Sequence, residues 1–291
     1  MLFIPITIAA AAFQVGRNAT QRSLMGGGGP WAATLVRFLY GVPFTALFLA
    51  IAWAVVPHGR LHFSELFFLA AAIGGAAQIG ATAAILESMR RSSFALGTTF
   101  QQSLLPFSAL IGAVFFGDAL APYAWVGIAV VMGGIAVLSW PKEGVGGDWS
   151  GAWFGLLAGM CFAVSNNAFR QAGLSLEAPP FLAGIATVLF VQVFQTTALC
   201  AVLAVFSRSS LVVAFMSWRT SFWAGFFGAA ASACWFTALA MAPAGQVRAV
   251  GVIEMPMAAF AGRRLFAEKL TPLQWFVGLL TAAGVVAVAV G

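Results

Sequence analysis

Four ionisable side chains fall inside long apolar segments of this chain. Glu254 lies midway along one segment and Arg248 nearer its start, whereas Arg37 lies early in a second segment and Glu87 at the end of a third. Charged groups are costly to place in lipid, so each is a candidate for function. A buried guanidinium at Arg248 would suit a substrate carboxylate, and Glu254 could carry a proton.

The same charged residues also have structural interpretations. Arg37 and Glu87 are close enough to the ends of their segments to reach a membrane interface. Arg248 and Glu254 are six positions apart, about 120° around a regular helix, so each could pair with other groups. Gly251 and Pro256 could loosen that helix, and a broken helix that lines a cavity is one way to build a midplane binding site.

Uncharged polar residues recur at helical spacing within other apolar segments. Gln78 and Thr82 share one helix face, and Thr98 and Gln102 share another. In a bilayer such faces must meet protein or water. Hydrogen bonding between helices explains them, and so does a polar cavity. We therefore include all four residues among the candidates for substrate binding.

Several aromatic and amide residues complete the candidate site. Trp235 lies deep in an apolar segment, and with Tyr40 it could line an amphipathic site, although lipid contact or packing is the alternative. Asn18 and Asn167 occupy matching positions of an internal repeat described below. Asn167 is included with the binding residues, and the match favours a structural or gating role for Asn18.

Composition excludes several classes of function. The chain has 291 residues, 62% hydrophobic and 8% charged, against about 25% charged in a soluble domain. The net charge of +6 sits in loops and indicates topology, not nucleic-acid binding. The three cysteines lack C-x-x-C spacing, and His58 and His62 lie near one surface without a third ligand. We expect no metal, no cofactor and no enzyme activity.

Ten segments are long and apolar enough to span a bilayer, which needs about 20 residues each. They predict an all-α integral membrane protein with ten transmembrane helices. The segments cover residues 2–22, 30–56, 64–87, 93–116, 119–140, 150–172, 179–206, 217–241, 243–262 and 270–290.

The second half of the chain repeats the first, which divides it into repeat 1–141, linker 142–149 and repeat 150–291. Pro106 and Gly112 recur as Pro256 and Gly262 at an offset of 150. An odd number of spans in each half makes the two copies insert in opposite directions. Inverted repeats around a central cavity are typical of transporters that work by alternating access. The longest run of matches pairs Phe116, Asp118, Leu120, Pro122, Trp125 and Gly134 with Phe266, Glu268, Leu270, Pro272, Trp275 and Gly284.

Loop charge is distributed oppositely in the two halves, as fixed and opposite orientations require. One membrane face receives ten basic residues and the other only Arg60 and Arg170. The positive-inside rule makes the basic-rich face cytoplasmic and places both termini outside the cytoplasm. The ten are Arg17, Arg22, Arg90, Arg91, Lys142, Arg208, Arg219, Arg263, Arg264 and Lys269.

This organisation resembles the drug/metabolite transporter (DMT) superfamily, in particular its EamA-type members, over almost the whole chain. The resemblance is carried by two paired segments, from Leu105-Pro106 to Asp118-Ala119-Leu120 and from Met255-Pro256 to Glu268-Lys269-Leu270. Arg37 matches an arginine common early in the second span of that family. The resemblance implies transport of small metabolites in a bacterial-type cytoplasmic (inner) membrane, with both termini in the cytoplasm, opposite to the loop charge.

We therefore expect a secondary transporter, specifically an exporter, of small amphipathic metabolites such as amino acids. The alternative is transport of vitamins, nucleosides or organic cations by the same fold. An organic cation would make Glu254, and not Arg248, the dominant binding residue. Pro106, Pro256, Asn18 and Arg37 would serve structure or gating. The expected partners are a small-molecule substrate, membrane lipid and protons, without nucleic acid. A monomer is sufficient for this function, and the sequence also permits a dimer. An intramembrane enzyme and a sensory protein without solute flux are the rival classes.

Overall fold

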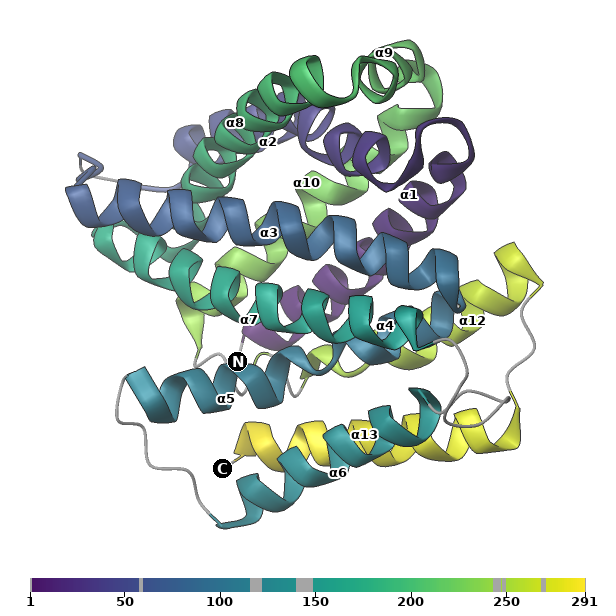
Figure 1. Cartoon of the computed structure of the whole chain (residues 1–291). Helices are drawn as coiled ribbons and strands as arrows, with labels where there is room; N and C mark the ends of the chain where they lie inside the picture. Colours follow the sequence, from purple (N-terminus) through teal and green to yellow (C-terminus); the bar gives the residue numbers. More distant parts are fainter. Residues whose placement is uncertain are drawn as a thin grey trace. The chain divides into compact units, whose positions relative to one another are not determined.

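The computed structural model describes residues 2–57, 60–115, 122–139, 149–242, 247, 250–267 and 271–290. These residues form helices and connecting turns, and no strand occurs among them (Figure 1). Several sequence features lie outside the described residues: Arg248, His58, Lys142, Asp118 and Glu268. The helices are α1 (Phe3–Leu39), α2 (Gly41–Val55), α3 (Glu65–Arg91), α4 (Phe94–Gln101), α5 (Leu104–Phe115), α6 (Pro122–Ser139), α7 (Ser150–Ser175), α8 (Pro180–Phe206), α9 (Arg208–Met216), α10 (Trp218–Met241), α12 (Glu254–Phe266) and α13 (Pro272–Val290).

The described helices include five that are long and apolar enough to cross a membrane, which identifies a membrane-embedded protein. Large apolar side chains on them are exposed, for example Val205 and Phe206 at the end of α8. Exposed apolar surface of this extent is unfavourable in water and suits lipid. The five spans are Gly29–Val55, Glu65–Arg91, Ser150–Ser175, Pro180–Phe206 and Trp218–Met241.

The break that the sequence places between the first two segments lies inside α1. Gly29 has φ 69° and ψ −173°, so the backbone leaves the helix there and resumes at Pro30. Only glycine adopts such a conformation without strain, and proline suits the first turn of the helix that follows. A second, smaller interruption at Tyr40 separates α1 from α2.

Two compact units make up the chain, and each takes segments from both sequence halves. Unit 1 comprises residues 1–79 and 165–243, and unit 2 comprises residues 80–164 and 244–291. Within unit 1, α1 packs against α10 and α2 against α8. Within unit 2, α4 packs against α12, and α6 lies beside α13 (Figure 1). The repeats 1–141 and 150–291 therefore describe sequence similarity and not the compact units.

One helix was not expected. The sequence predicts a loop between the segments 179–206 and 217–241, whereas Arg208–Met216 form α9. The helix is too short to span a bilayer, which is why a search for about 20 apolar residues misses it. Phe215 and Met216 are exposed on it, while Ala214 is buried among residues of α1, α8 and α10. The Tyr40 hydroxyl donates to the carbonyl oxygens of Ala214 and Phe215, each over 3.1 Å, and so connects the end of α1 to α9.

Candidate functional site

The apolar segment 93–116 was predicted as one helix but is broken in the structure. α4 ends at Gln101, residues Gln102 and Ser103 form a turn, and α5 begins at Leu104. Pro106 is the third residue of α5 and has no N–H to donate to the Gln102 carbonyl, as a regular helix would require. The Leu105 N–H donates to that carbonyl instead, over 3.2 Å.

The same break recurs 150 positions later. Residues Val252 and Ile253 form the turn, and α12 begins at Glu254 with Pro256 as its third residue. The Met255 N–H donates to the Val252 carbonyl over 3.0 Å, matching the bond at the first break. The expectation that proline loosens the helix near Glu254 is confirmed, and its counterpart at Pro106 shares the geometry. Both breaks lie in unit 2.

Buried polar residues surround the first break. Gln101, Gln102 and Ser103 are all buried, and so is Thr98, whose hydroxyl donates to the Phe94 carbonyl over 2.9 Å. The Gln101 Oε1 and Ser103 Oγ atoms have no hydrogen-bond partner in the described part of the chain. A buried polar atom without a hydrogen-bond partner destabilises the folded protein by about 1–3 kcal/mol. Such atoms therefore mark places where water or a solute can bind.

Glu254 is the acidic group of the second break. Its side chain is only 2% exposed, and it is the first residue of α12. A carboxylate is favoured there by the partial positive charge of a helix N-terminus. The partner helix in unit 2 is α4, and the Phe94 and Phe266 rings lie 5.4 Å apart between the two. The corresponding N-terminal residue of α5 is Leu104, so only one of the two breaks carries its own charge.

Two glycines of α7 allow close approach to the first break. A β-carbon at Gly159 would overlap Ser103 Oγ, and one at Gly155 would overlap the Phe100 side chain. These positions are four residues apart and therefore lie on one face of α7. Small residues at this spacing let helix backbones meet in membranes. Ser103 and Phe100 therefore lie directly against the α7 backbone.

Unit 1 contains a separate group of buried polar residues on α1. Arg17 donates to Asn18 Oδ1 through Nε and Nη2, over 3.1 and 2.7 Å. Gln21 donates to the Ala33 carbonyl across the Gly29 break, over 2.9 Å. The Arg37 side chain is buried within the protein, at 1% exposed. Asn18 thus holds an arginine in place, a contact that the repeat pattern alone did not predict.

A second polar group in unit 1 joins α2, α3 and α8. Gln195 donates to Gln78 Oε1 over 2.9 Å and to the Gly75 carbonyl over 3.0 Å. Thr45 donates to Gln192 Oε1 over 2.7 Å. The structure therefore gives Gln78 an interhelical hydrogen bond, the first of the two roles considered for it.

The remaining candidates are distributed over both units. Trp235 and Thr82 are buried and Asn167 is half-buried, in α10, α3 and α7 respectively. Tyr40 uses its hydroxyl to hold α9. Thr98, Gln102, Pro106, Glu254 and Pro256 thus belong to unit 2, whereas Tyr40, Gln78, Asn167 and Trp235 belong to unit 1. Among the described residues, no cluster of three potential metal ligands occurs.

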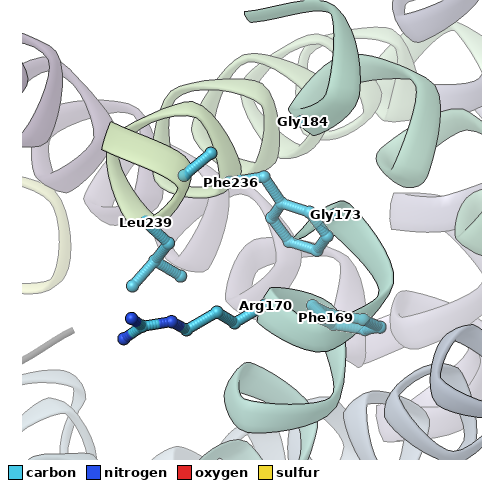
Figure 2. Close-up of a pocket in the computed structure, with 7 residues that line it drawn as sticks. Phe169, Arg170, Gly173, Gly184, Phe236 and Leu239 are labelled. Atoms are coloured by element: carbon cyan, nitrogen blue, oxygen red, sulfur yellow. The ribbon is translucent and has the colours of Figure 1, made fainter. Parts of the chain in front are cut away.

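A small pocket lies in unit 1 at the ends of three helices (Figure 2). It has a volume of about 10 Å³, room for roughly one water molecule. Phe169 and Phe236 form one wall, with ring centroids 4.7 Å apart. Arg170 extends along the other side next to Leu239 (Figure 2). The glycines Gly173 and Gly184 complete the lining with Ala240.

Comparisons with known proteins extend the description of the fold. No protein-family model matches the chain. An uncharacterized protein of Pseudomonas aeruginosa is 32% identical over 120 residues, which span 41% of this chain and 40% of that protein. A crystal structure with 16% identical residues matches 98% of this chain and 95% of the other, with a TM-score of 0.53. The helical arrangement is thus similar to one already seen by experiment.

Proposed function

We propose that this protein is a secondary transporter of small amphipathic metabolites and a member of the drug/metabolite transporter superfamily. The observation that carries the proposal is the pair of matched helix breaks before Pro106 and Pro256. Broken helices whose ends lie among buried polar groups are a recurring way to bind a solute within a membrane. The substrate site is accordingly placed at the breaks of unit 2.

Helix pairing supports the proposal of ten spans in two inverted repeats. Under the repeat offset, α2 corresponds to α8 and α6 to α13. Both of these pairs are in contact. A two-fold axis relating the repeats would bring equivalent helices together in this way. The proposed location is the cytoplasmic membrane of a bacterium, with export as the direction.

An amino acid is the proposed substrate, because the two breaks differ in charge. Glu254 at the start of α12 can pair with an ammonium group. The start of α5 has no carboxylate of its own, so the partial positive charge of its N-terminus favours a substrate carboxylate nearby. A zwitterion satisfies both ends. The buried position of Glu254 also favours the alternative, an organic cation, for which the α5 end would make no charged contact.

Ligand-dependent thermal stability followed by solute counterflow tests the proposal. The purified protein is screened against amino acids, nucleosides, vitamins and quaternary ammonium ions. A true ligand at 100 times its dissociation constant adds about 2.7 kcal/mol of stability. The stabilising compound is then loaded into proteoliposomes, and exchange with its labelled form is measured. Stabilisation by quaternary ions alone would select the alternative, and absence of flux for every stabilising compound would refute transport.

A further inference from the structure

The pocket between α7, α8 and α10 lies where three helices of unit 1 begin or end. Arg170 and Gly173 belong to the last two turns of α7, and Gly184 is the fifth residue of α8. Leu239 and Ala240 belong to the last turn of α10. The ends of membrane-spanning helices lie at the depth of the lipid headgroups. The pocket is therefore at headgroup depth and not at the membrane midplane.

Arg170 places a positive charge at this depth. Its side chain is half-buried, and it forms no ion pair or hydrogen bond with any residue that the structure describes. Glu177, an acidic residue in the following loop, is exposed. A guanidinium group binds phosphate through two parallel hydrogen bonds, and a desolvated arginine without a partner gains most from such a ligand.

The surroundings of the pocket are apolar and exposed. Leu174 lies one turn beyond Arg170 and is 53% exposed, and Phe181 lies one turn before Gly184 and is 42% exposed. The aromatic wall of Phe169 and Phe236 stands opposite the arginine (Figure 2). A charged group next to an open apolar surface matches a molecule with an anionic head and a hydrocarbon tail. A cavity of about 10 Å³ is too small to enclose a metabolite or a phosphate group, so a headgroup would lie at its mouth, next to Arg170.

We propose that an anionic membrane phospholipid binds at the mouth of this pocket, with Arg170 as the charged partner of its phosphate and Leu174 and Phe181 along the acyl chains. The site is separate from the paired breaks of unit 2 and does not depend on the substrate proposed for them. Basic pockets between helices at the membrane surface bind anionic headgroups by the same chemistry.

Native mass spectrometry of the detergent-purified full chain tests the proposal. The protein is titrated with phosphatidylglycerol and with phosphatidylethanolamine of the same acyl chains. We expect the wild type to prefer phosphatidylglycerol and Arg170→Gln to lose about fivefold in affinity for it, since one arginine near the surface contributes about 1 kcal/mol. Arg208→Gln removes an equal charge from an exposed site on α9 and should change nothing. Equal losses in both variants, or none in Arg170→Gln, would overturn the proposal.

Two further experiments support the test. The first uses a second variant, in case Arg170→Gln does not fold, and the second distinguishes a lipid from a soluble phosphate as the ligand. A methyl group at Gly173 would lie 3.9 Å from Thr187 Oγ1, so Gly173→Ala fills the cavity without a clash. Gly173→Ala should weaken phosphatidylglycerol binding although it leaves every charge in place. Unchanged binding would contradict the proposal that the lipid binds at this pocket. Glycerol 3-phosphate, which has the headgroup chemistry without acyl chains, should fail to displace the lipid. Displacement would make the pocket a site for soluble phosphates and refute a lipid site.

Discussion

Pro106 and Pro256 occupy the same place in two separate helix breaks. Each is the third residue of the helix that follows a two-residue turn, at Leu104 and at Glu254. Each leaves the carbonyl four positions earlier without its usual donor, and in each case the preceding residue donates to it instead. The two breaks have the same geometry because each contains a proline, whose ring and missing N–H prevent a continuous helix.

Replacing either proline by alanine should allow the broken helix to become continuous. Pro106→Ala supplies the N–H that can bond to Gln102, and Pro256→Ala supplies the one that can bond to Val252. We expect slower solute counterflow from both variants, with a change in unfolding free energy below about 1 kcal/mol. Pro122→Ala, at the first residue of α6, is the matched control and should transport normally. Wild-type rates in both break variants would contradict a role of the breaks in transport.

Neutralising Glu254 tests proton coupling. Glu254→Gln keeps the shape of the buried side chain but can neither bind nor release a proton. We expect accumulation driven by an imposed pH gradient to be lost, and counterflow to require a higher substrate concentration, because the substrate ammonium group loses its ionic partner. Glu65→Gln, an exposed acid at the start of α3, should behave like the wild type. If Glu254→Gln still accumulates solute in response to the gradient, the proton-carrier role is wrong.

The glycine face of α7 should be intolerant of side chains. Gly159→Ala places a methyl group against Ser103 Oγ and the Leu104 nitrogen at the first break. Overpacking of this kind costs about 1–3 kcal/mol, which should appear as a lower melting temperature in detergent. Gly278→Ala in α13 has no described atom within 4 Å of the new methyl group and should be neutral or stabilising. Equal melting temperatures for the two variants would show that the α7 contact is not tight.

Tyr40→Phe separates a structural role from a binding role. The phenol hydroxyl donates to carbonyls at the end of α9, so its loss should lower stability by about 1 kcal/mol. The ligand profile in the thermal screen should stay the same. A changed profile with unaltered stability would instead support the original expectation that Tyr40 contacts substrate.

Many features of the fold were accessible from the sequence. The apolar composition predicted a helical membrane protein, and Gly29-Pro30 marked the boundary between the first two segments. The recurrence of Pro106 at Pro256 predicted equivalent local structure in the two halves. Backbone chemistry explains these successes, because glycine and proline restrict the chain wherever they occur. The short helix α9 was not predicted, because it is shorter than a membrane span.

Only the tertiary structure decided which polar side chains meet. Gln195 reaches Gln78 across 117 positions of sequence, and Ser103 fits against Gly159 because that residue has no side chain. In a soluble protein the apolar side of a helix shows which face is buried. In a membrane lipid is as apolar as a protein interior, so hydrophobic periodicity does not mark the buried face. The sequence therefore determined the helical membrane character of the chain and the positions of the prolines and glycines that interrupt helices, whereas packing determined the contacts between them.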